Sequence, residues 1–285
     1  MGTKNKNINN IVANFSQILE FAKGYGLLIA KKRAVLREYL QMKLIDLIYQ
    51  EKISTRIFFI GGTALRLLHG LDRFSEDLDF DTDKISDRQI LDLMEGLSKR
   101  LQKEQIAVSL YKNTTPKKSY FELRFTDLLF QLNLSKSKQE KLVIKFDFES
   151  FWQGQNRKVT LLKKYGFIIN IVSIPLDQIL VQKLHAYINR RQTMPRDLYD
   201  IVWLWGQEAK ADLSFIKKNK LPKELVTKAI EKWKKEKKIL STAKRKLRPF
   251  LINEQNVNRL EMFESVLEKI LFYPDAPTLN LVKAR

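Results

Sequence analysis

Residues 57–80 read IFFIGGTALRLLHGLDRFSEDLDF, and the expected fold is built outward from this segment. The apolar run Ile57–Ile60 stops at Gly61 and Gly62, and residues 63–69 then place apolar side chains at helical spacing. Residues 77–80 alternate acidic and apolar side chains, as a strand does when one of its faces is buried. The segment therefore predicts a strand, a glycine turn, a helix and a second strand.

The rest of the chain shows the same two periodicities. Helical spacing is expected over residues 10–50, 86–103, 176–191, 196–206 and 223–240. Alternating strands are expected over residues 107–111, 120–125 and 142–148, and none is expected from residue 175 onward. The sequence therefore predicts an α+β fold in two domains. Residues 1–172 would form a mixed sheet flanked by helices, and residues 173–285 would form a basic helical domain that binds the substrate.

Composition limits the kind of protein. The chain has 285 residues and no cysteine, which excludes disulfides and thiolate zinc sites. No apolar run approaches the roughly 20 residues that cross a bilayer, and the polar first ten residues do not resemble a signal peptide. We therefore expect a cytoplasmic protein with no membrane partner.

The charge of the chain is strongly positive and unevenly distributed. Lys and Arg outnumber Asp and Glu by 52 to 32, which gives a net charge of +20. Residues 210–248 contain 15 basic and 4 acidic residues, so +11 of the +20 lies in this segment. The clustering predicts a basic surface that binds nucleic acid, whereas lysines spread evenly would only keep the surface solvated.

The glycine turn is a candidate phosphate site. Glycine lets the backbone approach a ligand closely, and the start of a helix offers free N–H groups and a partial positive charge. We therefore expect Gly61, Gly62 and Thr63 to bind a phosphate, with Ser75 donating to it and Arg66 balancing its charge. The alternative is a tight turn that uses glycine for conformational reasons alone.

Two acidic residues of the second strand are candidate metal ligands. Asp77 and Asp79 lie two residues apart on a strand, so both carboxylates point to the same face. Such carboxylates repel each other unless they share a proton or a cation, and hard oxygen ligands suit Mg²⁺ bound together with substrate phosphates. The sequence predicts a site for two Mg²⁺ ions with Asp147 as the third ligand. Glu149 is the alternative third ligand. The other alternative is that Asp147 and Glu149 bind no metal and simply lie on an ordinary exposed face of their strand.

These residues resemble the DNA polymerase β-like nucleotidyltransferases, which carry a Gly-Gly or Gly-Ser turn, an Asp-x-Asp and a later Asp. Four motifs in order narrow the resemblance to the AbiEii/AbiGii toxins, relatives of the mycobacterial MenT toxins. The motifs are Gly61-Gly-Thr-Ala-Leu-Arg-Leu, Arg73-Phe-Ser-Glu-Asp-Leu-Asp-Phe, Lys183-Leu-His-Ala and Arg196-Asp-Leu-Tyr-Asp200. The resemblance spans about residues 59–205 and implies a bilobed enzyme that uses a metal-bound nucleoside triphosphate and blocks growth.

The later motifs add candidate site residues. The resemblance implies that Lys183 binds the triphosphate and that Asp200 belongs to the active site, where it is better placed than Asp197 to reach a cleft. Arg190 lies two turns after Lys183 on one expected helix, so both side chains could face a polyphosphate. Arg196 would balance further charge, and Asp197 would orient Arg196 or Lys183. The alternatives are a lysine that only snorkels from a packing helix and a structural cluster of salt bridges.

The sequence thus predicts a Mg²⁺-dependent nucleotidyltransferase toxin of a toxin–antitoxin system, which releases pyrophosphate. The acceptor would be the 3′ end of tRNA, because several relatives in the resembling family modify that end. The expected partners are a nucleoside triphosphate, tRNA or another RNA, and a cognate antitoxin. Two alternatives stay open: transfer to a protein or small molecule, and a non-catalytic protein that binds nucleic acid or an antitoxin.

Overall fold

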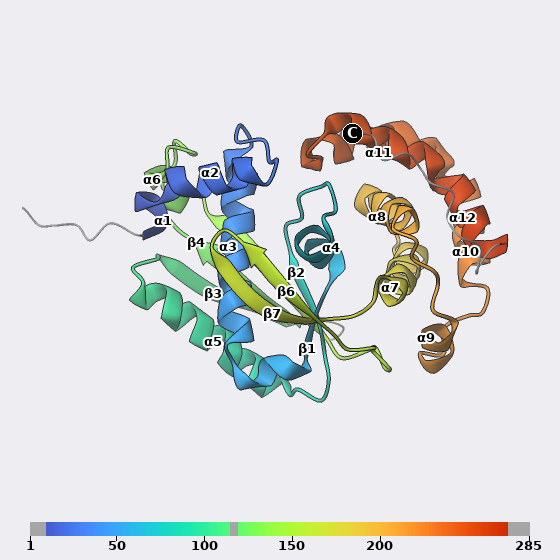
Figure 1. The fold of residues 1–285 in the computed structure, drawn as a ribbon, viewed down its shortest axis with the longest axis horizontal. Coiled ribbons are helices and arrows are strands. Elements are labelled where there is room, and N and C mark those ends of the chain that lie inside the picture. The colour runs from blue at the N-terminus through green and yellow to red at the C-terminus, as the bar shows by residue number, and fades with distance from the viewer. Residues whose placement is uncertain (1–9, 115–118, 273–285) are drawn as a thin grey trace, which may run out of the picture. The chain divides into compact units, whose positions relative to one another are not determined.

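The computed structural model describes residues 10–114 and 119–272 (Figure 1). The chain forms two compact units. Unit 1 contains the described residues up to 68, residues 74–150 outside the gap, and residues 159–173; unit 2 contains residues 69–73, 151–158 and 174–272. The chain passes from unit 1 to unit 2 for the last time after residue 173, next to the domain boundary expected at residue 172. Residues 69–73 and 151–158, which were expected in the first domain, belong to unit 2.

Unit 1 is built on a mixed sheet of five strands in the order β1-β2-β5-β4-β3. The strands β2 and β5 run parallel, and the other neighbouring pairs are antiparallel. The five strands expected from the alternation of the sequence are all present, with small shifts at their ends. Their bounds are β1 (Ile57–Ile60), β2 (Leu78–Thr82), β3 (Val108–Thr114), β4 (Ser119–Phe125) and β5 (Leu142–Glu149).

Aromatic side chains pack on one face of the neighbouring strands β1, β2 and β5. The ring centroids of Phe59 and Phe80 are 5.4 Å apart, and the ring of Phe80 stacks on that of Phe148 at 5.2 Å. Phe59 and Phe80 are completely buried. Because side chains alternate along a strand, burial of Phe80 sends the neighbouring Asp79 to the opposite face of the sheet. The core of unit 1 thereby fixes the direction of the Asp79 side chain.

Helices cover the sheet of unit 1. Helix α3 packs against β5 and β7, and α5 packs against β3. The helical pattern expected over residues 10–50 is interrupted at Gly26, whose φ of +72° lies in the left-handed region and ends a helix. A capping box between Ser86 and Gln89 starts α5. The helices are α1 (Asn10–Ala13), α2 (Phe15–Gly24), α3 (Lys32–Tyr49), α4 (Gly61–His69), α5 (Asp87–Lys103) and α6 (Leu128–Gln131).

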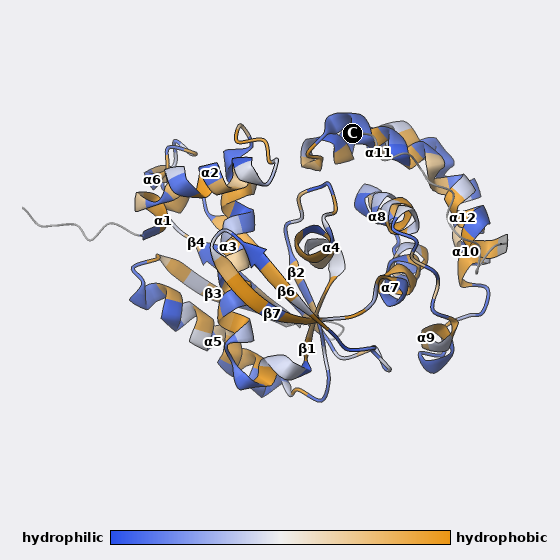
Figure 2. Ribbon diagram, in the orientation of Figure 1, coloured by the Kyte–Doolittle hydropathy of each residue, from blue (hydrophilic) through white to orange (hydrophobic). Residues whose placement is uncertain are grey.

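Two strands were not expected from the sequence. Strands β6 (Lys158–Lys164) and β7 (Phe167–Ser173) form a separate two-stranded sheet, and β7 packs against β1 and α3. Figure 2 shows the apolar character of β7 along most of its length. Strand β6 has a single buried residue, Leu162, and therefore lacks the regular alternation of buried and exposed residues by which a half-buried strand is predicted.

Unit 2 is helical, as expected. Helix α7 packs against α8 and α10, and α12 packs against the same two helices. Within residues 174–272 the structure contains no strand, apart from an isolated bridge between Leu251 and Arg73. The helices are α7 (Leu176–Asn189), α8 (Pro195–Gly206), α9 (Leu213–Lys218), α10 (Leu225–Glu236), η2 (Lys237–Ile239), α11 (Leu240–Leu247), η4 (Glu254–Met262) and α12 (Phe263–Phe272).

No helix within residues 10–114 and 119–272 combines enough length with enough apolar character to cross a membrane.

A buried carboxylate ties several elements of unit 1 together. Glu38 of α3 lies 2.8 Å from Arg66 Nε and 2.6 Å from Lys164 Nζ, and the Tyr165 hydroxyl donates to it over 3.2 Å. Burial alone would raise the pKa of Glu38, but the two cations outweigh burial and hold the pKa below its usual value. The ionised carboxylate therefore joins α3 to α4 and to the end of β6.

Replacing Glu38 by Gln should destabilise unit 1, because Arg66 and Lys164 would stay buried without their carboxylate. The free energy of unfolding at pH 7 should fall by about 3–5 kcal/mol. The folded-state pKa of Glu38 is lowered, so its contribution is present above the usual pKa of 4.5 and is lost as the pH falls through the lower folded-state value. Chemical denaturation at pH 7 and at acid pH should therefore show a difference between the two proteins that shrinks in acid.

The control for this measurement is Asp92→Asn. Asp92 pairs with Arg88 at 3.0 Å on the surface of α5, with both side chains more than half exposed. Loss of such a pair should change the stability by less than about 0.5 kcal/mol. Equal effects of Glu38→Gln and Asp92→Asn would contradict the structural role of Glu38.

Candidate active site

Gly61 joins β1 to α4 and touches the second acidic residue of the Asp-x-Asp pair. Its φ of +75° lies in the left-handed region, which residues with a side chain rarely adopt. A Cβ atom built on Gly61 would lie 2.2 Å from Oδ2 of Asp79, so the carboxylate occupies the space that another side chain would fill. Glycine is therefore required here by the backbone conformation and by the position of Asp79.

The register of the sheet places Asp147 beside Asp79. Asp79 on β2 is paired with Ile60 on β1 and with Asp147 on β5. Because β2 and β5 run parallel and in register, the side chains of Asp79 and Asp147 leave the sheet on the same face. Glu149 is paired instead with Asp81, two residues further along the strands. The register therefore favours Asp147 over Glu149 as the nearer carboxylate.

The neighbour of Asp147 on its own strand is a lysine. Lys145 Nζ donates to Oδ2 of Asp147 over 2.9 Å, and Asp147 is 7% exposed, whereas Asp77 and Asp79 are half-buried. In the part of the chain that the structure describes, no three Asp, Glu or His side chains are gathered to hold a metal ion. The predicted set of three carboxylates is therefore not preassembled. Asp77 and Asp79 nevertheless fit Mg²⁺, which commonly takes one or two carboxylates together with substrate phosphates.

Buried polar side chains hold the backbone that leads into β2. The Thr63 hydroxyl is completely buried and donates to the carbonyl oxygen of Asp77. Gln41 of α3 is 1% exposed, and its Nε2 donates to the carbonyl oxygens of Ser75 and Glu76 over 3.1 and 3.0 Å. The hydroxyl of Thr63 thus positions Asp77, and what the turn offers a phosphate is its backbone N–H groups. Ser75 is half-buried and stays a prediction as a donor.

The expected role of Arg66 needs correction. Arg66 is 7% exposed, its Nε lies 2.8 Å from Glu38, and its guanidinium lies 5.7 Å from the centre of the Phe74 ring. Its charge offsets that of a buried carboxylate inside unit 1. The sequence around the turn gives no sign of this pairing, because Glu38 lies 28 residues earlier, on the buried face of α3.

A second cation near the acidic pair was missed. Arg37 of α3 donates to the carbonyl oxygen of Val143. Burial lowers the pKa of Arg37, and the negative charges of Glu76 and Asp77 act in the opposite direction. Arg37 therefore interacts electrostatically with the two acidic residues that precede β2. A lysine- and arginine-rich helix offers no signal that would single out this one residue.

Unit 2 contains a buried ionic cluster around Asp200 on α8. Arg73 donates to both carboxylate oxygens of Asp200 over 2.7 Å, and Lys183 Nζ lies 2.7 Å from Oδ2. Asp200 is completely buried, which alone would raise its pKa, but the two cations lower the pKa below its usual value. The expectation that Asp200 reaches a cleft is therefore wrong, because its carboxylate faces cations inside unit 2 and can act on a ligand only through them.

The same cluster includes Asp197, one turn earlier on α8. Arg190 Nε lies 2.8 Å from Oδ2 of Asp197, and Lys183 Nζ lies 3.9 Å from Oδ1. The helical spacing thus brings Lys183 and Arg190 to one carboxylate, and their side chains remain 13% and 43% exposed. Arg196, the second residue of α8, is half-buried. Lys183 and Arg190 therefore keep part of their surface exposed while they are paired within the cluster.

The short segment 69–73 is fastened to unit 2 by more than one interaction. The Tyr199 hydroxyl donates to Oδ1 of Asp72 over 2.8 Å, and Arg259 Nη1 donates to Oδ2 over 3.0 Å. Arg73 belongs to a motif of the sequence, but its role as the main partner of Asp200 was not expected. A buried arginine is uncommon unless it is paired, so the burial of Arg73 in the structure is what identifies its role.

Comparisons with known proteins were made in sequence and in structure. The family model "Nucleotidyl transferase AbiEii toxin, Type IV TA system" matches residues 44–275. None of the curated proteins is significantly similar in sequence. The structure of JHP933 from Helicobacter pylori is 19% identical, with a TM-score of 0.51 over 84% of this chain and 93% of that chain. The toxin MenT4 from Mycobacterium tuberculosis is 21% identical, with a TM-score of 0.48 over 74% of this chain and 76% of that chain.

The family match and the fold agree with the motifs of the sequence. The matched residues include the glycine turn, the acidic pair and the whole ionic cluster around Asp200. JHP933 shares the fold. Since the match covers most of the chain, the protein belongs to the AbiEii nucleotidyl transferase toxin family of Type IV toxin–antitoxin systems.

Proposed function

We propose that this nucleotidyltransferase moves a nucleotide from a nucleoside triphosphate to the 3′-hydroxyl of an RNA, with tRNA as the acceptor. The observation that carries the proposal is the contact between Asp79 and Gly61 at the start of α4. It brings the carboxylate of Asp79, which we assign to the metal site, next to the N–H groups of a helix N-terminus. These two groups bind complementary parts of a magnesium–triphosphate complex.

The acidic pair and the glycine turn would hold the triphosphate. Asp77 and Asp79 would bind Mg²⁺, which neutralises phosphate charge and lowers the pKa of the attacking hydroxyl. The backbone N–H groups of residues 61–63 would bind a phosphate oxygen. The acceptor oxygen then bonds to the α-phosphorus in line as the bond to pyrophosphate breaks. Asp147 stays a prediction as a further metal ligand, because Lys145 holds one of its oxygens.

Unit 2 contributes its own candidate phosphate ligands, which are cations. The partly exposed ammonium group of Lys183 would contact a phosphate of the substrate. Arg190 and Arg196 would balance further negative charge of the phosphates. Asp200 would keep Lys183 oriented, since the two groups lie 2.7 Å apart. Asp197 would do the same for Arg190, at 2.8 Å.

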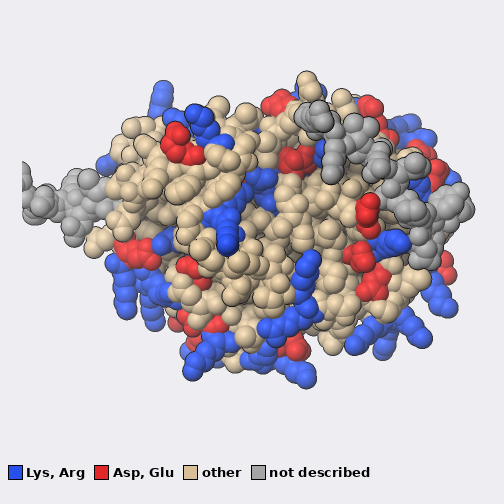
Figure 3. Space-filling view, viewed as in Figure 1, with Lys and Arg blue, Asp and Glu red and all other residues tan. Residues whose placement is uncertain are grey.

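An RNA acceptor fits the charge of unit 2. The segment 210–248, with its net charge of +11, forms α9, α10 and α11. Figure 3 shows a group of Lys and Arg side chains over α9. Phosphate contacts from such a surface make binding strongly dependent on salt. An RNA acceptor and a triphosphate donor put the reaction in the cytoplasm, and the family implies a cognate antitoxin as a further partner.

The direct test is incubation of the purified protein with total tRNA, Mg²⁺ and each α-labelled nucleoside triphosphate in turn. Label should appear on tRNA with at least one nucleotide and should disappear when Mg²⁺ is chelated. Label on added protein but not on tRNA would move the proposal to a protein acceptor. No label with any nucleotide would contradict the proposed reaction.

Asp77→Asn and Asp79→Asn should each reduce transfer by about 10³-fold or more, because a catalytic metal contributes several kcal/mol to the transition state. The folded state should be retained, as judged by thermal unfolding. Asp83→Asn removes an exposed acid that directly follows β2 and should leave transfer unchanged. Equal activity in all three variants would exclude the acidic pair as metal ligands.

Gly61→Ala should separate Asp79 from the glycine turn, since the new Cβ would overlap the carboxylate oxygen. We expect a loss of transfer together with a destabilisation of about 1 kcal/mol or more from the positive φ. Gly70→Ala is the matched control, because Gly70 has a φ of +79° but open space around its Cα. If both variants lose the same activity, the contact with Asp79 has no catalytic importance.

Asp200→Asn and Lys183→Met should act differently. Asp200→Asn leaves Arg73 and Lys183 buried without their carboxylate and should lower the free energy of unfolding by about 3–5 kcal/mol. Lys183→Met should raise the KM for the nucleoside triphosphate by about tenfold or more, through loss of a charged hydrogen bond. Glu231→Gln, an exposed change on α10, should affect neither measurement. A normal KM in Lys183→Met would contradict its role in binding the triphosphate.

A further inference from the structure

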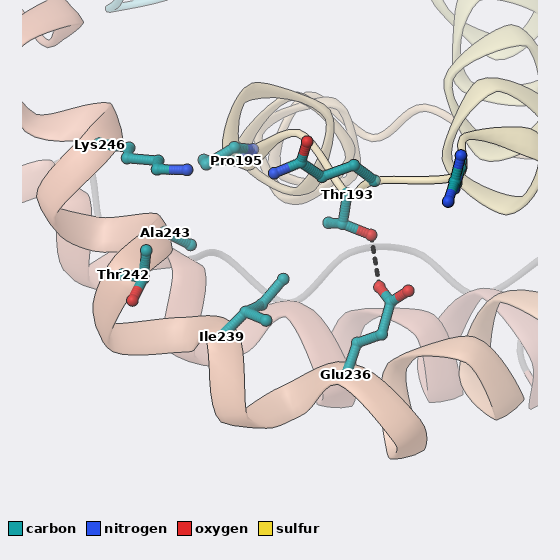
Figure 4. A pocket seen from close by; sticks show the side chains of 9 residues that line it. Thr193, Pro195, Glu236, Ile239, Thr242, Ala243 and Lys246 are labelled. Atoms are coloured by element: carbon teal, nitrogen blue, oxygen red, sulfur yellow. Dashed lines mark hydrogen bonds between the residues drawn. The ribbon is translucent and has the colours of Figure 1, made fainter.

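Unit 2 contains a pocket of about 240 Å³ that lies between the α7–α8 connection and the segment from α10 to α11 (Figure 4). Its apolar surface comes from Pro195, Ile239 and Ala243. Figure 4 shows Ile239 pointing into the space below the α7–α8 connection. Short apolar side chains of this kind offer a planar ring a surface to pack against.

One end of the pocket carries a carboxylate that is held in place. The Thr193 hydroxyl donates to Oε2 of Glu236, and Lys232 Nζ lies 3.9 Å from Oε1. Lys232 is fixed by the carbonyl oxygens of Tyr187 and Arg190, over 2.7 and 2.6 Å. Glu236 is therefore an oriented hydrogen-bond acceptor. It favours an amino group inside the pocket and repels a phosphate or a carboxylate.

The rim of the pocket has the opposite charge. Arg191 and Lys246 both line it and are exposed. Within residues 10–114 and 119–272, no carboxylate pairs with either of these two side chains. Lys238 and Arg245, also exposed, extend the positive charge along the segment that follows α10. The pocket thus combines a neutral-to-acidic interior with a cationic edge, which suits a base flanked by phosphates.

We propose that this pocket binds one unpaired nucleotide of the acceptor RNA. A base with an exocyclic amino group would lie on Pro195 and Ile239 and donate to Glu236, and adjacent phosphates would contact Arg191 and Lys246. Uracil presents a carbonyl oxygen where cytosine presents an amino group, so Glu236 should disfavour it. The proposal rests on RNA being the acceptor, but it can be tested without the transfer reaction.

The chemistry of the pocket favours RNA over an acidic protein as its occupant. An acidic peptide would place a carboxylate near Glu236, and the two negative charges would repel each other. A nucleotide places its charge on the phosphates and its donors on the base, which matches the separation of charges between rim and interior. A free nucleoside triphosphate has the same chemistry, so the experiment includes it as a competitor.

The test is fluorescence anisotropy of labelled oligo(rC) and oligo(rU), each of about eight nucleotides, with the full chain at one fixed salt concentration. The wild type should bind oligo(rC) about tenfold more tightly than oligo(rU). Glu236→Gln should bring the two affinities together, because an amide can accept from cytosine and donate to uracil. Equal affinities in the wild type, or an unchanged ratio in Glu236→Gln, would overturn the proposal.

A second pair of variants tests the pocket itself. Thr242 lines the pocket from the exposed side of α11, whereas the neighbouring Ser241 is exposed and lies outside the lining. Thr242→Leu should weaken oligo(rC) binding by about tenfold by filling the pocket, and Ser241→Leu should leave it unchanged. Thermal unfolding checks that both variants are folded. Equal binding by the two variants would show that the pocket is not used.

Competition separates the other occupants. If CTP displaces oligo(rC) at a concentration equal to that of unlabelled oligo(rC), the site takes a free nucleotide and the RNA assignment is overturned. If poly-L-glutamate displaces oligo(rC) equally well from the wild type and from Thr242→Leu, the surface belongs to an acidic protein. Asp79→Asn should bind oligo(rC) like the wild type, so a failure of transfer and a failure of this pocket give different results.

Discussion

The contact between the Asp79 carboxylate and the Cα of Gly61 is the constraint around which unit 1 is organised. It fixes β2 against the junction of β1 and α4, where Ile60 is already paired with Asp79. A shift of one residue in this register would turn Asp79 toward the aromatic core and Phe80 away from it. The buried Thr63 hydroxyl then sets the carbonyl of Asp77 on the same backbone. The start of the helix, the register of the sheet and the acidic pair are thus specified together.

Both units bury a carboxylate and surround it with cations, but the consequences differ. Glu38 pairs with the buried Arg66 inside unit 1, so this ion pair stabilises the fold. Asp200 forms ion pairs with Arg73 and with Lys183, and the Lys183 side chain is 13% exposed. A buried pair contributes little net stability compared with apolar packing, although breaking it is costly. The Asp200 cluster therefore holds the ammonium group of Lys183 in one orientation.

Local patterns of the sequence predict the part of the site that local structure builds. The strand, the glycine turn, the helix and the second strand follow from residues within 24 positions of one another, and all are present, although the second strand begins at Leu78 and leaves Asp77 just before it. Failures occur where the partner is distant in sequence. Arg66 has a partner 28 residues earlier, and no pattern near α4 reveals it. The half-exposed strand β6 fails for a different reason, because it lacks a regular alternation of buried and exposed residues.

The position of Asp200 in the chain has a consequence for synthesis on the ribosome. Arg73 and Asp200 are 127 residues apart, so the segment 69–73 leaves the ribosome long before its main partner exists. The five-stranded sheet, which ends at β5, can pair during that interval, since domains form as they emerge from the N-terminus. A chain interrupted before α8 would carry the acidic pair of unit 1 but no Lys183–Asp200 cluster. Incomplete translation products would therefore lack the paired Lys183 and Asp200 that the proposed function assigns to the triphosphate.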